Sequence, residues 1–422
     1  MRVLWITESP SKYKSTKLGY NGRGWIESLQ SALETSTEIS QLGIAFSHFT
    51  DSSKLLQDKV IYYPIKKIGH KGLISRIISR WIKTDSHEKE ILILNEIIKD
   101  FGPDVVHIFG TESWLCHVIK LTDVPSIVHL QGILQPIMNS YTPPGISNLD
   151  LIKSSWSKFI KGFGLWHDKK VFRIMTEREY SYFKQIQYFM GRTNWDKSIS
   201  TFLSSSSTYF HVDEVLRDVF YEATPWKYIK EKKITITSTL SDSIYKGLDL
   251  IIKTAVVLVK EGFEFEWRII GLSNESSSVL LFKKKLDIKY SDISIQFLGI
   301  RTGNEIVTLL SETTVYVHAS YIDNSPNSLC EALLMGVPAI STNVGGISSL
   351  IDDSIDGFIV PPNDPYYLAS RIALLSRDEA YLTKVSKRAK DRAQKRHSKE
   401  SILNQLIEAY KSSIQLDVSK RS

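Results

Sequence analysis

The sequence predicts an α/β protein made of two doubly wound domains, each with its own parallel sheet. Its 422 residues exceed what one ordinary hydrophobic core accommodates, so two domains of roughly 200 residues each are expected. Short apolar runs alternate with segments of helical periodicity along the chain, which is typical of βαβ units. A polar, proline-containing break near the middle of the chain separates two such series.

Short apolar runs mark the predicted strands. In the first half they are Val3–Ile6, Ile44–Phe46, Val105–Phe109 and Ser126–Leu130. The second series is Ile234–Ser238, Trp267–Gly271, Ser294–Leu298, Val315–His318 and Pro338–Ser341. Between the first two strands of this second series, Leu248–Lys260 has apolar positions at helical spacing and is predicted to be a helix.

The domain boundary is predicted where Thr224-Pro225 and the lysine-rich run after Trp226 interrupt the pattern. We therefore expect an N-terminal domain over 1–222, a linker over 223–233, a C-terminal domain over 234–395, and a helix and tail over 396–422. We expect that last helix to pack back toward the N-terminal domain.

The composition, 42% apolar and 23% charged residues, is that of a soluble globular protein. The apolar run Val3–Ile6 is too short for a signal peptide or a membrane span, and only Cys116 and Cys330 are present, so a cytoplasmic location is expected. Histidines and carboxylates show no metal-ligand spacing, and no metal or other cofactor is expected. The net charge of +7 leaves nucleic acid, an anionic membrane or an ordinary surface open.

A segment with two glycines follows the first predicted strand, where a dinucleotide-binding motif would be expected. Gly22-Arg23-Gly24-Trp25 precedes a helical run through Leu33, and the G-x-G-x-x-G pattern of dehydrogenases is absent. Gly22 and Gly24 let the backbone approach an anionic or sugar ligand, although an ordinary loop explains them equally well.

The segment from His318 to Ile351 carries the clearest functional pattern. Ser325 is a good N-cap and Pro326 a good first helical residue, while Gly336 ends the helix predicted over 326–335. The N-terminus of this helix, at Ser325, Pro326 and Asn327, suits a diphosphate. Glu331 is placed to accept both hydroxyls of a ribose, and the glycines of Asn343-Val344-Gly345-Gly346 can approach the phosphates or the sugar.

These residues resemble the family-4 glycosyltransferases of GT-B fold. The family signature is a pair of carboxylates eight positions apart, here Asp323 and Glu331. The resemblance extends to Lys246-Gly247, to Phe297-Leu298-Gly299 and to Asp356–Pro361. It implies two Rossmann-like domains facing a cleft, with the acceptor side in the domain over 1–222 and the nucleotide-sugar donor mostly in the domain over 234–395. It also implies retaining, metal-independent transfer of a sugar from a nucleotide diphosphate, with UDP-sugars favoured over GDP-sugars.

The resemblance also implies roles for individual residues. Lys246 would neutralise the departing diphosphate, Asp323 would hold the transferred sugar and Glu331 the ribose. A solvated surface lysine and a helix-capping aspartate are the plainer interpretations of the first two. The residues expected to contact the donor are Gly22, Gly24, Gln131, Gly271, Gly299, Ser325, Pro326, Asn327, Gly345 and Gly346.

Three positions depart from the family pattern. Asp323 stands where the family usually has glutamate, and Gln131 where it commonly has histidine. The arginine usual before the lysine is missing, because Thr239-Leu240-Ser241-Asp242 stands there. Arg192 and Arg301 are the candidates to share the diphosphate. His129 is predicted to be a packed core histidine.

The N-terminal half resembles a narrower branch, the bacterial surface-polysaccharide glycosyltransferases, through Asp104–Glu112, Gly191–Asp196 and Asp213–Arg217. The expected acceptor is a glycan or a lipid-linked saccharide. Residues 69–84 read as a basic amphipathic helix that rests on the inner face of an anionic membrane, or as an ordinary domain helix. A second basic aromatic stretch, Lys153–Arg173, is a candidate to line the acceptor cleft.

Two other function classes compete with transfer. A non-catalytic protein that binds nucleotide sugars or glycans could use the same fold, since fold alone does not guarantee chemistry. A nucleic-acid-binding protein would explain the basic patch, but the sequence has no recognition motif for one, and no nucleic acid partner is expected.

Overall fold

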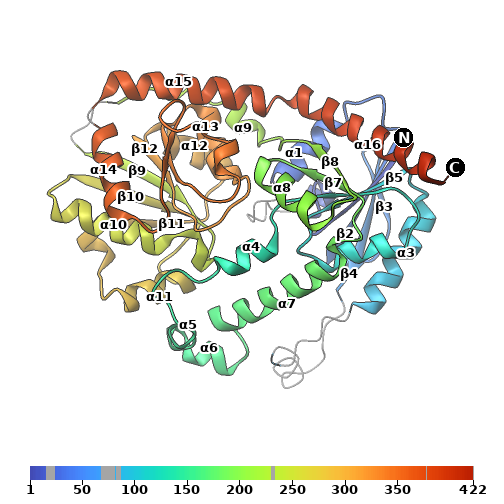
Figure 1. Ribbon diagram of the computed structural model, residues 1–422, viewed down its shortest axis with the longest axis horizontal. Helices are drawn as coiled ribbons and strands as arrows, with labels where there is room; N and C mark the ends of the chain where they lie inside the picture. The colour runs from blue at the N-terminus through green and yellow to red at the C-terminus, as the bar shows by residue number, and fades with distance from the viewer. Residues whose placement is uncertain (16–23, 68–80, 82–86, 230–232, 377, 422) are drawn as a thin grey trace. The chain divides into compact units, whose positions relative to one another are not determined.

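The computed structural model describes residues 1–15, 24–67, 81, 87–229, 233–376 and 378–421 (Figure 1). The chain divides into two compact units. Unit 1 comprises residues 1–135, 171–215 and 397–422, and unit 2 comprises residues 136–170 and 216–396. Each unit has one sheet and its own helices, so the predicted α/β class with two parallel-sheet domains is confirmed.

The units differ from the predicted domain bounds in two respects. The chain passes into unit 2 at residue 216, ahead of the predicted linker, and residues 136–170 belong to unit 2 instead of the N-terminal domain. Their helix α5 (Asn148–Ser154) packs against α11 (Ser277–Lys285), and Lys285 Nζ lies 3.0 Å from Asp150 Oδ2. A contact between residues so far apart in the sequence has no local signal.

Unit 1 is built on an eight-stranded sheet, in which all neighbouring strands are parallel except the pair β3 and β4 at one edge. The strands in sheet order are β3 (Leu55–Gln57), β4 (Val60–Lys66), β2 (Gln41–His48), β1 (Arg2–Thr7), β5 (Val105–Phe109), β6 (Ser126–His129), β7 (Tyr188–Gly191) and β8 (Thr208–His211).

The sheet of unit 1 is buried on both faces, as a parallel sheet with helices on each side requires. Along β1, Val3 and Trp5 join one apolar cluster, and Leu4 and Ile6 join the other. Successive strand residues point to opposite faces, so the alternation places one cluster on each side. The described helices of unit 1 are η1 (Tyr13–Ser15), α1 (Gly24–Leu33), α3 (Glu88–Phe101), η2 (Trp114–Lys120), α8 (Asn194–Leu203) and α16 (Lys399–Arg421).

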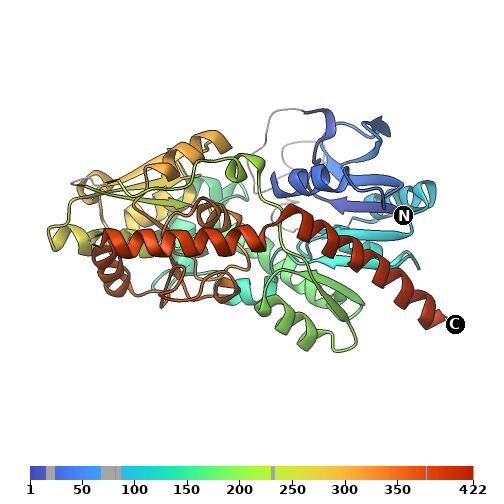
Figure 2. The same ribbon diagram turned by 90° about the horizontal axis from the view of Figure 1, so that it is seen from above.

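The C-terminal helix α16 completes one face of this sheet (Figure 2). It contacts α1, β5 and β6, and its residue Tyr410 is fully buried. The Tyr410 hydroxyl accepts a 3.0 Å hydrogen bond from Trp5 Nε1. The described residues after 396 therefore belong to the core of unit 1. No helix among the described residues is long and apolar enough to cross a bilayer.

Unit 2 has a six-stranded parallel sheet. Its strands in sheet order are β11 (Ile295–Gly299), β10 (Phe265–Ile270), β9 (Ile234–Thr239), β12 (Val315–His318), β13 (Ala339–Thr342) and β14 (Phe358–Val360). Strand order reverses beside β9, because β10 lies on one side of it and β12 on the other. Such a switch point opens a ligand-binding crevice at the carboxyl ends of the strands.

The helices of unit 2 form two packed groups (Figure 1). In one group, α10 (Leu248–Lys260) contacts α11 and α14 (Pro365–Leu375). In the other, α13 (Asn327–Met335) contacts α9 (Asp218–Tyr221) and α15 (Glu379–Arg396), and α12 (Gly303–Ser311) contacts α9. The remaining helices are η3 (Ile244–Lys246), η4 (Tyr290–Ile293), η5 (Ile347–Ser349) and α6 (Trp156–Ile160), while α4 (Leu134–Asn139) and α7 (Leu165–Phe183) cross the division between the units.

Candidate functional site

Two loops meet at the carboxyl ends of the central strands of unit 2. The loop after β9 leads through η3 to Gly247, which has a φ of +79°. A Cβ atom there would lie 1.8 Å from the carbonyl oxygen of Ala319, in the loop after β12. The backbone N–H of Tyr321 also donates a 2.8 Å hydrogen bond to the Tyr245 carbonyl. Only glycine permits this approach of the two backbones.

The first predicted pair of catalytic residues meets where these loops touch. Lys246 Nζ lies 2.6 Å from Asp323 Oδ2, and both side chains are largely buried. His318, the last residue of β12, places its Nε2 3.0 Å from the same oxygen. The other ring nitrogen of His318, Nδ1, lies 2.9 Å from the Ser341 hydroxyl at the end of β13. Lys246 and His318 thus both contact the Asp323 carboxylate, and Ser341 supports His318.

The charges of this cluster stabilise one another. Burial raises the pKa of the Asp323 carboxyl, but Lys246 and His318 outweigh burial and bring that pKa well below its usual range. Burial lowers the pKa of the Lys246 ammonium, yet Asp323 and Tyr245 leave it raised overall. Lys246 is therefore a fixed positive charge in a poorly solvated place, and an incoming diphosphate would have to share it with Asp323.

The glycine loop after β13 wraps around the backbone of Asp323. Gly345 has a φ of +52°, and a Cβ atom there would lie 1.9 Å from the Asp323 carbonyl oxygen. That oxygen also accepts a 3.0 Å hydrogen bond from the Gly346 N–H. Gly345 and Gly346 therefore fix the position of Asp323, whatever further contact they make with a ligand.

Glu331, in the interior of α13, forms a bidentate ion pair with Arg217. Arg217 Nε and Nη2 lie 2.7 and 2.8 Å from the two carboxylate oxygens. Burial raises the pKa of Glu331, and Arg217 opposes that rise. Arg217 directly precedes α9, which packs against α13. A ribose that bound to Glu331 would do so at a carboxylate already neutralised by a guanidinium.

The amino end of α13 differs from the prediction by one residue. The helix begins at Asn327, with Pro326 in the capping position at φ −70° and ψ 114°, and its carbonyl accepts hydrogen bonds from the N–H groups of Leu329 and Cys330. Ser325 is therefore not the N-cap, and its hydroxyl lies 3.8 Å from Cys330 Sγ. The buried Oδ1 of Asn327 has no hydrogen-bond partner among the described residues. The helix ends at Gly336, as predicted.

Gly271 and Gly299 occupy the ends of neighbouring strands. The Gly271 N–H donates to the Gly299 carbonyl at 2.8 Å, and a Cβ atom on Gly271 would lie 2.2 Å from the Leu240 carbonyl oxygen. Gly271 therefore supports the loop that carries Lys246. Nothing lies within 4 Å of the place where a Gly299 Cβ would be. Arg301, beyond β11, donates a 3.3 Å hydrogen bond to the carbonyl of Ile300.

Arg192, Gln131, Gly24 and His129 lie in unit 1, whereas residues 153–170 of the predicted acceptor-lining stretch lie in unit 2. Arg192 is buried, with its Nε 3.7 Å from Glu214 Oε2 and its guanidinium 4.2 Å from the Trp25 ring centroid. Gln131 follows β6 and is partly exposed, and Gly24 opens α1. Gly22 and residues 69–80 and 82–84 lie outside the described part of the chain. His129 is fully buried, with its Nδ1 3.2 Å from His107 Nε2, so its predicted core position is confirmed.

Sequence reasoning did not find the partners of the site residues. His318 is the last residue of a predicted strand, and no sequence pattern linked its side chain to Asp323. In the stretch that lacks the family arginine, the Asp242 carboxylate accepts hydrogen bonds from the N–H groups of Ser277 and Ser278, each at 2.8 Å, at the start of α11.

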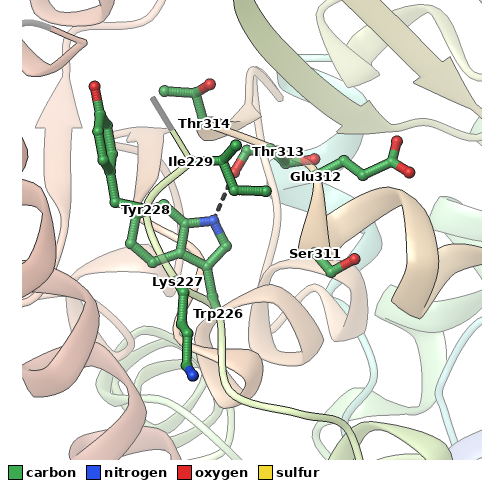
Figure 3. Close-up of a pocket in the computed structure, with 8 residues that line it drawn as sticks. All are labelled: Trp226, Lys227, Tyr228, Ile229, Ser311, Glu312, Thr313 and Thr314. Carbon is green, nitrogen blue, oxygen red and sulfur yellow. Dashed lines mark hydrogen bonds between the residues drawn. The ribbon is translucent and has the colours of Figure 1, made fainter. Parts of the chain in front are cut away.

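A small pocket lies at the opposite end of the sheet (Figure 3). It is lined by Trp226, whose indole Nε1 donates a 2.7 Å hydrogen bond to the Thr313 carbonyl, and by Thr314, which immediately precedes β12. Its cavity volume is about 10 Å³, room for roughly one water molecule. The pocket is therefore unrelated to the cluster at the carboxyl ends.

Comparison with known proteins identifies part of the chain. Residues 221–396 match the family model described as glycosyl transferases group 1. WcaL of Salmonella typhimurium, described as a colanic acid biosynthesis glycosyltransferase, is 28% identical over 168 residues, which cover 38% of this chain and 41% of that protein. The match thus spans about two fifths of the relative's own length.

Solved structures match nearly the whole chain. Sucrose-phosphate synthase from Thermosynechococcus elongatus aligns over 97% of this chain and 98% of its own, with a TM-score of 0.71 and 12% identity. HepE of Anabaena, solved in complex with UDP-glucose, aligns over 98% of this chain and 100% of its own, with a TM-score of 0.65 and 14% identity. These likenesses are likenesses of fold, and the predicted GT-B class is confirmed.

Proposed function

We propose that this chain, whose residues 221–396 form a group 1 glycosyltransferase domain, transfers a sugar from a nucleotide diphosphate to a glycan or lipid-linked acceptor. The transfer would retain the anomeric configuration and serve the synthesis of a surface polysaccharide. The observation that carries the proposal is the cluster of Lys246, Asp323 and His318 at the strand ends of that domain, which provides a buried positive charge where a diphosphate would lie.

The donor would bind across the loops of unit 2. Lys246 supplies a full positive charge to the diphosphate, and the N–H groups at the start of α13 add the positive end of a helix dipole. Glu331 can accept hydrogen bonds from the two ribose hydroxyls while Arg217 keeps its carboxylate in place. Arg192 and Arg301 remain the candidates for a second base at the diphosphate.

Bond breaking between the sugar and the diphosphate would leave negative charge on the phosphate. Lys246 stabilises that charge where it develops, which lowers the barrier. The departing phosphate itself takes the proton of the acceptor hydroxyl, so the proposed transfer needs no side chain as a general base. Asp323 holds the Lys246 ammonium in place, and its carboxylate would accept a hydroxyl of the transferred sugar. The proposed reaction uses no metal ion.

Uridine is the favoured base of the donor, and guanosine is the alternative. The solved structure of HepE holds UDP-glucose on the same fold, which supports a uridine donor here without fixing the sugar. Separate assays with a UDP-sugar, a GDP-sugar and an ADP-sugar distinguish the bases.

The acceptor side would lie at the cytoplasmic face of the membrane. The basic amphipathic sequence over 69–84 supports a peripheral contact with anionic lipid. Replacing Arg76, Arg80 and Lys83 with glutamine tests that contact by sedimentation with anionic vesicles, and salt-insensitive or unchanged binding would contradict it.

The experiment for the proposed function is turnover of a nucleotide sugar by the purified full chain with a lipid-linked saccharide acceptor. Release of nucleoside diphosphate together with a glycosylated product is the expected result, and proton NMR of the product gives its anomeric configuration. A product of inverted configuration would contradict retention. Tight donor binding with no release of diphosphate from any donor would contradict catalysis.

A further inference from the structure

Large apolar side chains are exposed on the segment that joins α4 to α7 within unit 2. We call residues 147–163, which contain α5 and α6, the α5–α6 segment (Figure 1). Leu149 is 63% exposed, Trp156 59% and Ile160 56%, and helix α6 has no buried residue. Large apolar side chains gathered on one short segment are an unusual surface for a soluble protein.

Asp150 of this segment pairs with Lys285 of α11, and the other charged residues of the segment are all positive. Lys153, Lys158 and Lys161 stand among the apolar residues, and no acidic residue occurs between Asp150 and Asp168. All three lysines are exposed, and none of them makes an ion pair with another described residue. The last turn of helix α11, which packs against α5, carries Lys283 and Lys284, both exposed, so positive charge continues on the neighbouring element.

Internal contacts hold the segment in one shape. The Phe159 ring stacks on Trp156 with 5.5 Å between centroids, and it meets the Trp166 ring edge-on at 5.4 Å. His167 Nε2 lies 3.0 Å from the Phe159 carbonyl oxygen. At the other end, Asp150 pairs with Lys285 of α11 at 3.0 Å. The outward direction of Trp156 and Ile160 is therefore built into the fold.

We propose that the α5–α6 segment docks on an anionic lipid surface. Trp156, Ile160 and Leu149 would enter the interface between headgroups and acyl chains, where tryptophan is favoured. The lysines would reach the headgroup phosphates with their ammonium groups while their stems lie along the apolar residues. Ser155 and Ser157 flank Trp156 and would suit a glycan, but the three exposed lysines of this segment favour an anionic lipid surface.

This surface adds a membrane contact to the proposed function and is distinct from residues 69–84. Membrane binding by the α5–α6 segment does not depend on binding of the nucleotide sugar, because none of its residues belongs to the Lys246 cluster. The two proposals can therefore fail separately.

The test is sedimentation of the purified full chain with vesicles of phosphatidylcholine, alone or mixed with phosphatidylglycerol. We expect salt-sensitive binding to the mixed vesicles only. The variant K153Q/K158Q/K161Q should bind them on the order of 100-fold more weakly, since each lysine near an anionic surface contributes about a fivefold factor. The variant W156S/I160S should also bind more weakly, and its loss should persist at high salt.

The matched control is K384Q/K387Q/R388Q, which removes the same charge from exposed positions of α15. It should bind the vesicles as the unaltered chain does. Equal losses in the control and in the lysine variant would overturn the proposal, because net charge alone would then explain binding. Normal vesicle binding by K153Q/K158Q/K161Q would also overturn it, and loss of transfer to a soluble acceptor in that variant would then assign the segment to the acceptor.

Discussion

Lys246 and Asp323 lie 77 positions apart in the sequence, yet the Lys246 Nζ is 2.6 Å from Asp323 Oδ2. The fold creates this contact because β9 and β12 are neighbours in the sheet and their loops leave from the same edge. The close approach of Gly247 to the Ala319 carbonyl then fixes the distance between the loops. Removal of the lysine is the most direct test of what this pair does.

Lys246→Ala should lower the turnover of a nucleotide sugar by on the order of 100-fold or more, because the departing diphosphate loses its charge partner. The effect should appear in kcat more than in KM if the lysine acts as charge develops. Steady-state kinetics measure both constants. Lys253→Ala is the matched control, since Lys253 also pairs with an aspartate, Asp249, at 2.8 Å in unit 2. Equal losses in the two variants would contradict the role given to Lys246.

Arg217→Ala should destabilise unit 2 by about 3 kcal/mol, because it leaves the buried Glu331 carboxylate without its bidentate partner. Arg217→Lys should retain part of the stability, since an ammonium keeps the charge but cannot match two oxygens. The double variant R217M/E331M should cost less than the two single methionine variants together. Urea unfolding at pH 7 gives these values, and additive costs would show that the two residues do not interact.

Gly345→Ala should destabilise the protein and reduce donor binding, because a methyl group at this position would overlap the Asp323 carbonyl oxygen. The left-handed backbone alone costs an alanine about 1–2 kcal/mol. Gly262→Ala separates the two effects, since Gly262 has a φ of +73° and nothing within 4 Å of its Cβ position. Thermal unfolding and nucleotide binding should both be affected more in the Gly345 variant, and identical behaviour of the two would argue against the contact.

Glu179 of unit 1 should make stability depend on pH. Burial, with a smaller contribution from Glu112, raises its pKa to about 7, although Thr111 and the Leu134 N–H donate hydrogen bonds to it. A carboxyl with a raised folded-state pKa favours folding fully below its unfolded value of roughly 4.3, and this contribution is lost as pH rises through the folded value. The loss should amount to about 3 kcal/mol between pH 4.5 and 7.

Glu179→Gln should remove that pH dependence, because glutamine does not ionise. Melting temperatures of the unaltered protein and the variant, measured from pH 4.5 to 7.5, test whether the pH dependence of stability is lost. Glu177→Gln, an exposed position on the same helix, should leave the dependence unchanged. A pH profile that is the same in all three proteins would contradict the raised pKa of Glu179.

The sequence predicted those elements whose signals are local. Leu248–Lys260 is helical as expected from its apolar spacing, and α13 ends at Gly336 as expected from glycine. Strand β4 was missed because Pro64 stands within it, and proline usually argues against a paired strand. The short strands β7 and β8 have few residues from which a period can be read.

Features that depend on distant contacts were not predictable. Arg217 and Glu331 are 114 positions apart, and neither residue has a neighbour that marks it as an ion-pair partner. Residues 136–170 carry no sign that α5 packs on α11. Lys246 and Asp323 were both expected at the donor site, but their direct contact follows only from the strand order around β9.

Thermal unfolding of the full chain with UDP, GDP, ADP and CMP tests the central claim most directly. A ligand present at 100 times its dissociation constant should add about 2.7 kcal/mol to stability. We predict stabilisation by one nucleoside diphosphate, kept in Lys253→Ala and weakened in Lys246→Ala. Absence of stabilisation by every nucleotide, or equal stabilisation of both variants, would contradict a donor site at Lys246.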